Sequence, residues 1–278
     1  MRILVTNDDG IDSLGLHELA RAMTELAGDH EIVVAAPDRE YSGAAASVGA
    51  LHLIQPEVHV SSIDGLDVDA VWSVTGPPAL CVFFARLGAF GDRFDLVVSG
   101  INPGANVGRA VYHSGTVGAA LTARNGAVTG VAVSQAVSGF GVEGQGWDDA
   151  LANQKWRTAA VVGRQVVQSV IDEPPSTALV INVNVPNLEV DEIKGWRHAT
   201  VGMQPPRSMA KARLDPIVGK QGAFTVEMGW GDERDLAPET DGGAVERGHV
   251  AVTYLSRFDH VPEEEHSATT KALDALLD

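Results

Sequence analysis

The sequence holds a single cysteine, Cys81, and no lysine before Lys155. One cysteine excludes an internal disulfide and a multi-cysteine zinc site, and such scarcity is typical of a reducing compartment. Without an early lysine, and without a Gly-Lys-Ser/Thr triplet anywhere, the first half of the chain cannot carry a P-loop. The chain also lacks a Gly-x-Ser-x-Gly nucleophile elbow and a pair of histidines at the spacing of a zinc-binding helix.

Positive charge is scarce as well, since 20 Lys and Arg face 37 Asp and Glu, which gives a formal net charge of −17. Nucleic-acid grooves and anionic membrane surfaces need clustered Lys and Arg, so we expect neither a nucleic-acid duplex nor a membrane as partner. No run of about 18 apolar residues that could span a bilayer is present. The apolar run near the N-terminus is shorter than a signal-peptide core, so we expect a cytoplasmic protein.

Short runs that are apolar throughout alternate with longer segments of helical periodicity. The runs are Ile3–Val5, Ile32–Ala36, Leu96–Val98, Val131–Val133 and Leu179–Ile181. The periodic segments predict helices over 14–26, 78–90, 115–126 and 150–172. Because apolar runs without alternation suit strands covered on both faces, the pattern predicts an α/β fold with a mostly parallel sheet and helices on both faces.

The pattern changes after Pro186. Residues 203–243 contain four prolines, many glycines and many charges, which predicts loops and hairpins. An apolar run returns at Val250–Val252, and a terminal helix is predicted near 267–277. We therefore divide the chain into an α/β core, residues 1–186, and a C-terminal extension, residues 187–278. The extension is either a small subdomain or an arm that packs on another subunit, and we expect it to take part in oligomerisation.

Oxygen-bearing side chains follow three of the predicted strands. Asp8 and Asp9 follow the first strand, Ser42 the second, and Asn102 the strand that begins near residue 96. In parallel α/β sheets, ligands bind beyond the carboxyl ends of the strands. An isolated Asp-Asp-Gly is more often an ordinary turn or helix cap. Two carboxylates about 4 Å apart, however, repel by roughly 4 kcal/mol at an effective dielectric near 20, and a divalent cation removes that repulsion. An all-oxygen ligand set favours Mg²⁺ or Mn²⁺ over Zn²⁺.

Two further loops are rich in glycine and polar residues, namely Gly104–Gly108, which contains Asn106, and Ser114–Thr116, which opens a predicted helix. The unpaired N–H groups and the positive dipole end of a helix N-terminus bind anions. Ser114 is also a normal helix cap, and the two roles are compatible. In so acidic a chain, an anion site must reverse the local charge with a metal and backbone amides.

Other acidic and imidazole groups are weaker candidates. Asp67 and Asp69 lie in a polar stretch, so we interpret them as surface residues rather than a phosphatase nucleophile. His113, within the glycine-rich region, is interpreted as an ordinary loop residue. Asp259 and His260 form an acid/base candidate in the C-terminal extension.

Taken together, four motifs in order resemble the SurE (survival protein SurE) family of metal-dependent 5′/3′-nucleotidases. The motifs are Met1–Gly10, Ala36–Arg39 with Ser42 and Gly43, Val97–Asn102 with Gly104, Asn106 and Gly108, and Ser114–Ala120. Weaker matches are Ile181–Pro186, Ile193–Gly195 and Thr240–Gly248. The likeness spans nearly the whole chain.

The resemblance implies a Rossmann-like core, hydrolysis of nucleoside 5′- and 3′-monophosphates by metal-activated water, and a homodimer or homotetramer formed through the extension. It also implies one divalent ion per subunit, Mg²⁺ or Mn²⁺. The implied metal ligands are Asp8, Asp9, Ser42 and Asn102. The implied substrate-binding residues are Gly43, Asn106, Ser114, Gly115 and Thr116. The implied catalytic residues are Asp8, Asn106 and Ser114.

The chain departs from the family pattern at three positions. His113 stands where the family usually has Tyr, and Pro77 and Leu80 stand where it has Thr and Asp. These departures leave open a non-catalytic nucleotide- or phosphate-binding regulator with the same fold. A phosphatase that forms an aspartyl-phosphate intermediate is a third reading.

Overall fold

The computed structural model describes residues 1–138, 147–204, 207–256 and 267–277. Asp259 and His260, the predicted acid/base candidate, lie outside the described residues. None of the helices in the described ranges has the length and apolar character needed to cross a bilayer.

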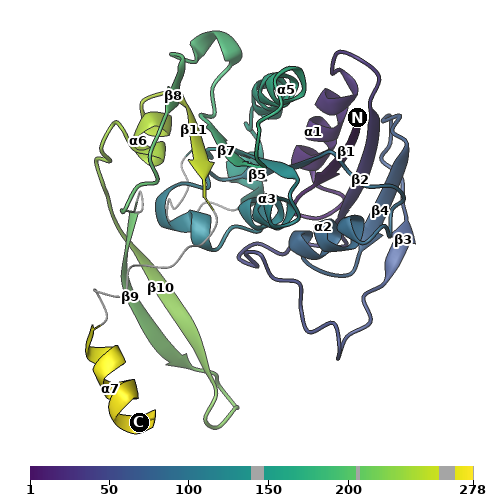
Figure 1. Cartoon of the computed structure of the whole chain (residues 1–278). Coiled ribbons are helices and arrows are strands. Elements are labelled where there is room, and N and C mark those ends of the chain that lie inside the picture. Colours follow the sequence, from purple (N-terminus) through teal and green to yellow (C-terminus); the bar gives the residue numbers. More distant parts are fainter. Residues whose placement is uncertain (139–146, 205–206, 257–266, 278) are drawn as a thin grey trace.

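A mixed sheet forms the centre of the molecule (Figure 1), with the strand order β3-β4-β2-β1-β5-β6-β7-β11-β8 in the described part of the chain. The strands are β1 (Arg2–Thr6), β2 (Glu31–Pro37), β3 (Val58–Val60), β4 (Ala70–Val74), β5 (Leu96–Pro103), β6 (Thr129–Gln135), β7 (Val180–Val185), β8 (Trp196–His198) and β11 (Val250–Leu255). The six strands from β4 to β7 run parallel, while β3 and β11 pair antiparallel with their inner neighbours. The predicted mostly parallel sheet is confirmed.

Helices cover both faces of this sheet, as predicted. Helices α1 (Leu14–Thr24) and α5 (Trp156–Asp172) pack together on one face, and α2 (Pro78–Arg86) and α3 (Gly115–Asn125) on the other (Figure 1). Successive strand side chains point to opposite faces. In β1, Ile3 and Val5 therefore join the core cluster under α1 and α5, whereas Leu4 joins the cluster under α2 and α3. This double coverage is why the strand is apolar throughout.

Three details differ from the sequence prediction. In place of the single helix predicted over 150–172, the structure has two helices, α4 (Trp147–Leu151) and α5. The helix is interrupted because residues 154 and 155 form hydrogen bonds with Gln135, Ala136 and Asn187. The helix predicted over 78–90 ends at Arg86. Strands β3 and β4 were not predicted, because β3 is an exposed edge strand and β4, beside it, is only partly buried.

The order in which the chain adds strands to the sheet reverses between β1 and β5. After β1 the chain adds β2 and β4 on one side, and then returns to place β5, β6 and β7 on the other. Such a reversal opens a crevice at the carboxyl ends of the two central strands, which is the usual ligand position in doubly wound folds. Asp8 and Asp9 follow β1, and Asn102 lies at the end of β5. Asp8, Asp9 and Asn102 therefore lie at the carboxyl ends of the two central strands, where the strand order reverses.

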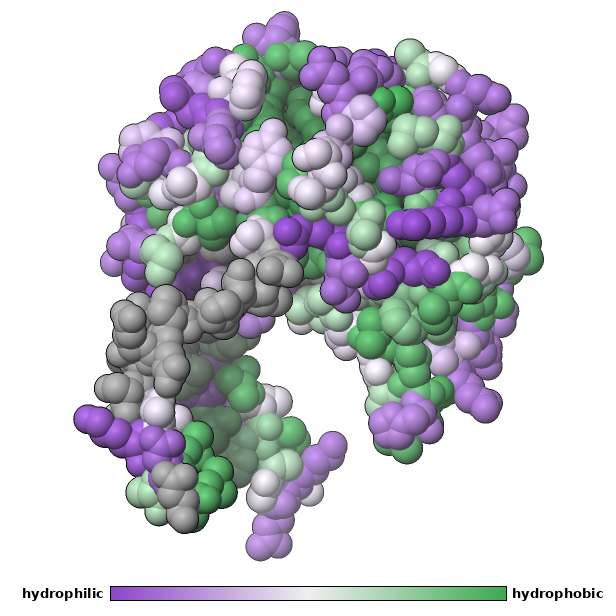
Figure 2. All heavy atoms as spheres, viewed as in Figure 1, coloured by the Kyte–Doolittle hydropathy of each residue, from purple (hydrophilic) through white to green (hydrophobic). Residues whose placement is uncertain are grey.

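The C-terminal extension contributes to the sheet and also leaves it. Strands β11 and β8 continue the sheet beyond β7. The hairpin of β9 (Arg207–Pro216) and β10 (Phe224–Glu233) extends away from the body, and Figure 2 shows hydrophobic side chains along it. Helix α6 (Asp241–Glu246) packs beside β11, and α7 (Ser267–Leu277) is the last described element.

A buried carboxylate fastens the extension to the core. Asp241, at the first position of α6, is fully buried. It accepts hydrogen bonds from the backbone N–H groups of Gly108 at 2.9 Å, Gly202 at 3.0 Å and Gly242 at 2.8 Å. Gly108 begins a short 3-10 helix, Gly108–Tyr112, which leads into α3. The extension therefore holds the loop between β5 and α3.

We expect Asp241→Ala to lower the free energy of unfolding by about 3 kcal/mol or more, because three buried N–H groups lose their acceptor. Urea unfolding followed by circular dichroism measures the change. Asp235→Ala is the control, since exposed Asp235 makes a surface ion pair with Arg247, and such pairs contribute about 1 kcal/mol or less. Equal, small losses in both variants would contradict the anchoring role of Asp241.

Candidate active site

Asp8 lies against the N-terminus of α3. Its side chain is only 2% exposed, and its Oδ1 accepts a hydrogen bond from the Thr116 hydroxyl at 2.5 Å. A Cβ added to Gly115 would lie 2.7 Å from Asp8 Oδ2, so only glycine allows this close approach. The structure thus brings Asp8, Gly115 and Thr116 into direct contact, although they are more than 100 residues apart in the sequence.

The loop after β2 is tied to both sides of this contact. The Tyr41 N–H donates to the Asp8 carbonyl at 2.7 Å, and the Ala45 N–H donates to the His113 carbonyl at 3.0 Å. Ser42 and Gly43 lie between these two anchors and are exposed. The predicted Ser42 and Gly43 are therefore held next to the Asp8 loop and the start of α3, without a direct side-chain hydrogen bond to either within the described residues.

Asn102 is placed by an irregularity in β5. The register between β5 and β6 shifts between Gly100 and Asn102, and such bulges redirect the side chains that follow. The Asn102 amide nitrogen donates to the Gly104 carbonyl at 2.6 Å. Its amide oxygen has no hydrogen-bond partner in the described part of the chain and remains available as a ligand.

Ionisation of both Asp8 and Asp9 is unfavourable unless a positive charge lies nearby. Burial raises the pKa of Asp9 to about 9, and the neighbouring carboxylates of Asp8 and Glu40 add to this increase. Burial also raises the pKa of Asp8, against the lowering effect of its hydrogen bonds from Thr116. A nearby cation would remove this strain, because it stabilises both ionised carboxylates.

The donor set fits a hard divalent cation. Asp9 Oδ2, Asn7 Oδ1 and Asp38 Oδ1 are buried at the same edge and have no hydrogen-bond partner in the described ranges. Buried polar atoms normally have partners, and these oxygens have the chemistry of ligands for a hard cation. The described residues include no cluster of three or more His, Cys, Asp or Glu side chains that could hold a metal. A site here must therefore combine the two carboxylates with hydroxyl and amide oxygens, as Mg²⁺ and Mn²⁺ prefer.

Ser114 and Asn106 lie on the segments on either side of the short 3-10 helix. The Ser114 hydroxyl accepts the Val117 N–H at 3.1 Å, so the expected helix cap is present and its hydroxyl hydrogen stays free to donate. The Gly115 N–H, at the first turn of α3, has no partner among the described residues. Asn106 is 7% exposed and is held by hydrogen bonds to β6 and β7. His113 is exposed, as expected for a loop residue.

Several polar groups of the site were not predicted. Glu40 adds negative charge beside the acidic pair, and Ser134, Asn182 and Asn184 surround Asn106. One signal was available, because Asn182 and Asn184 alternate with valine in a strand that is otherwise apolar. Asp67 and Asp69 are exposed, which confirms that they are surface residues.

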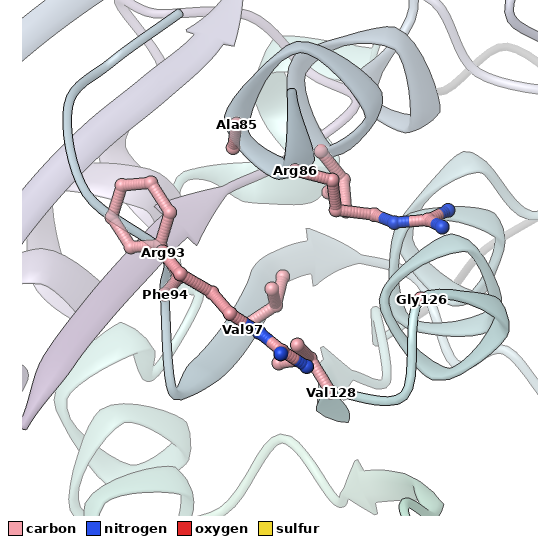
Figure 3. A pocket seen from close by; sticks show the side chains of 8 residues that line it. Ala85, Arg86, Arg93, Phe94, Val97, Gly126 and Val128 are labelled. Atoms are coloured by element: carbon pink, nitrogen blue, oxygen red, sulfur yellow. The ribbon is translucent and has the colours of Figure 1, made fainter. Parts of the chain in front are cut away.

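A cavity of about 260 Å³ lies at the other end of the sheet, near the amino ends of β5 and β6 (Figure 3). Arg86 and Arg93 are its charged residues, and the remainder is mostly apolar. The Arg86 side chain lies against Gly126 and donates to the Thr122 carbonyl at 3.3 Å, so it caps the C-terminus of α3. Arg86 therefore has a structural role, and the cavity holds none of the predicted site residues.

The fold and the site together define a doubly wound α/β protein that joins an acidic pair to a helix N-terminus at the reversal of strand order. Residues 3–207 match the family model described as "Survival protein SurE". The chain belongs to the SurE family.

Named relatives match over nearly the full length. The chain is 35% identical to the 5′/3′-nucleotidase SurE of Erwinia tasmaniensis over 269 residues, which cover 96% of this chain and 93% of that relative. It is also 35% identical to the 5′/3′-nucleotidase SurE of Klebsiella pneumoniae over 277 residues, covering 99% and 96%. The solved SurE protein from Aquifex aeolicus matches with a TM-score of 0.73 and 29% identity over 100% of both chains.

We expect Thr116→Val to weaken Mn²⁺ binding by about 10- to 100-fold, because the valine cannot donate the hydrogen bond that orients the Asp8 carboxylate. Isothermal titration calorimetry measures the dissociation constant for Mn²⁺. Thr122→Val is a matched control on the same helix, since its buried hydroxyl donates to the Gly118 carbonyl and does not contact Asp8. The same affinity in wild type and both variants would reject the role of Thr116.

Proposed function

We propose that this protein hydrolyses nucleoside 5′- and 3′-monophosphates to a nucleoside and inorganic phosphate, with a divalent cation as cofactor. The observation that carries the proposal is the buried carboxylate of Asp8, which contacts the N-terminal turn of α3 while Asp9 Oδ2 beside it lacks a partner in the described residues. The relatives named as 5′/3′-nucleotidases support the same activity.

Asp8, Asp9, Ser42 and Asn102 are the proposed ligands of one Mg²⁺ or Mn²⁺ ion per subunit. Asp8 and Asp9 follow β1, Ser42 follows β2 and Asn102 lies at the end of β5, and these three strands are neighbours in the sheet. When bound, such a cation lowers the pKa of water and polarises a phosphoryl oxygen. The buried, partner-free oxygen of Asp9 and the free amide oxygen of Asn102 support this assignment.

In the proposed reaction, some groups of the protein act on the attacking water and others hold the phosphate. Thr116 holds Asp8 Oδ1, so Oδ2 is the oxygen that orients the attacking water and accepts its proton. The water oxygen bonds to phosphorus as the ester P–O bond breaks. The leaving nucleoside oxygen takes a proton from solvent, and Asp8 later returns the proton of the attacking water to solvent. The Gly115 N–H, the Ser114 hydroxyl and the Asn106 amide are the proposed donors to the phosphoryl oxygens while charge develops on them.

The catalytic reading is favoured over a regulator that has lost turnover. Two of the three departures from the family pattern occupy packing positions, since Pro77 precedes α2 and Leu80 is fully buried in the core between α2 and the sheet. The third, His113, is exposed. The aspartyl-phosphate alternative makes a separate prediction, which is that labelled phosphate can be trapped on Asp8 after quenching.

We expect Asp9→Asn to reduce phosphate release from 5′-AMP and 3′-AMP by about 100-fold or more in the presence of Mn²⁺, because the substitution removes a charged ligand. A colorimetric phosphate assay with Mg²⁺, with Mn²⁺ and with EDTA measures the rates. Asp12→Asn is the matched control, because exposed Asp12 lies on the same loop. Phosphate release at the wild-type rate in Asp9→Asn, or a wild-type rate that EDTA leaves unchanged, would contradict the proposal.

We also propose that the protein forms a homodimer or homotetramer through its C-terminal extension, within the cytoplasm. The hairpin supports this, because Leu214 and Val226 face each other across its strands and are 62% and 59% exposed. Phe224 and Met228 on the same hairpin are exposed as well. Exposed apolar clusters of this kind mark interaction surfaces.

We expect the double variant Leu214→Glu/Val226→Glu to dissociate the oligomer, because association would bury two unpaired charges. Light scattering after size-exclusion chromatography should give 29.2 kDa for the variant and a multiple of it for the wild type. Lys220→Glu, in the hairpin turn, is the control for added negative charge. A wild type that is monomeric, or a double variant of unchanged mass, contradicts the proposal.

A further inference from the structure

Three buried side chains inside the sheet bind one residue of the loop after β5. Asn184 Oδ1 accepts the Asn106 main-chain N–H at 2.7 Å. The amide nitrogens of Asn182 and Asn184 donate to the Asn106 carbonyl at 2.9 and 3.2 Å. Ser134 Oγ accepts from the Asn106 side-chain amide at 2.8 Å. Asn106 is therefore held by its N–H, its carbonyl and its side chain.

The three side chains have no other hydrogen bonds among the described residues. Ser134, Asn182 and Asn184 are fully buried, and each makes its hydrogen bonds to Asn106 alone. Asn182 Oδ1 even remains without a partner in that part of the chain. Polar side chains in a sheet interior are unfavourable unless they are hydrogen-bonded. Their only hydrogen-bond partner among the described residues is Asn106, so their polarity relates to Asn106.

The register explains why these residues converge. Asn182 and Asn184 are two positions apart on β7 and so share a face of the sheet. Ser134 of β6 is the direct neighbour of Asn184. The three side chains form one polar patch, over which the loop containing Asn106 passes.

The contacts decide which part of Asn106 stays available. One hydrogen of its amide is donated to Ser134, and its backbone groups are taken up by β7. The second amide hydrogen and Oδ1 have no partner within the described ranges. A residue that only anchored the loop would not need its carboxamide fixed by a separate strand, because the main-chain bonds to β7 already hold the backbone.

We propose that Ser134, Asn182 and Asn184 are positioning residues, which orient the Asn106 carboxamide so that its second N–H donates to a phosphoryl oxygen of the substrate. This inference rests on the proposed function of Asn106 as a phosphate-holding residue. Donors fixed before the reaction stabilise developing charge better than mobile ones. Release of the amide from Ser134 therefore weakens binding of the phosphoryl group and slows turnover.

The test compares Ser134→Ala with Thr129→Val on the same strand. Thr129 is also buried, and its hydroxyl accepts the Leu179 N–H at 3.3 Å, far from Asn106 in the strand. Both substitutions remove one acceptor in β6, so a merely structural effect should be similar in the two. The measurements are kcat and KM for 5′-AMP with Mn²⁺, the dissociation constant for inorganic phosphate, and Tm.

We expect Ser134→Ala to lower kcat by about tenfold or more and to weaken phosphate binding, while Thr129→Val changes only Tm. Ser134→Thr, which keeps the hydroxyl, should restore most of both quantities. Asn106→Ala should lower kcat by about 100-fold. In the Asn106→Ala background, Ser134→Ala should have no further effect, because Ser134 acts through Asn106.

Two outcomes would overturn the proposal in different ways. If Asn106→Ala is impaired but Ser134→Ala behaves like Thr129→Val, or adds its full effect to Asn106→Ala, the positioning role is wrong and the role of Asn106 stands. If Asn106→Ala leaves kcat and phosphate binding unchanged, the phosphate-holding role of Asn106 is wrong, and the positioning role falls with it.

Discussion

The repulsion between two adjacent buried carboxylates is the constraint on which the site depends. Asp8 and Asp9 leave β1 at the reversal of strand order, where burial opposes ionisation of both. Ionised carboxylates persist at such a place only beside positive charge. The structure supplies part of it through the N-terminal turn of α3, which Gly115 allows to approach Asp8 closely. In the proposed function a divalent cation supplies the remaining positive charge, and oxygens on the neighbouring loops are its proposed ligands.

The same sheet provides both a rigid apolar support and a polar patch. Side chains of β1 divide between two apolar clusters, and this fixes the direction in which the chain leaves the strand toward Asp8. In β6 and β7, by contrast, Ser134 and Asn184 interrupt the apolar pattern and bind Asn106. Apolar packing therefore supports the acidic pair, whereas hydrogen bonds support the loop that contains Asn106.

Much of the fold could be predicted because the central strands are buried on both faces and therefore read as continuous apolar runs. Strand β4, next to the edge of the sheet, could not, since its residues are mostly only half-buried and mix Trp72 and Ser73 with valines. The acidic pair was predictable because it is local in sequence. The contacts of Asn106 were not, because Ser134 and Asn184 lie 28 and 78 residues away, and only folding brings them together. The anchoring role of Asp241 could not be predicted for the same reason, since Gly108 lies 133 residues away from it.

The attachment of α6 to the core has a consequence for the order of events during synthesis. Domains tend to fold as the chain emerges, from the N-terminus onward. The outer edge of β7 pairs with β11, and the Gly108 N–H is bound by Asp241. In a ribosome-bound chain that ends before residue 241, the outer edge of β7 is therefore unpaired by β11, and the Gly108 N–H lacks its acceptor Asp241. The edge of β7 and the loop at Gly108 therefore gain their partners only after residues 241–255 have been synthesised.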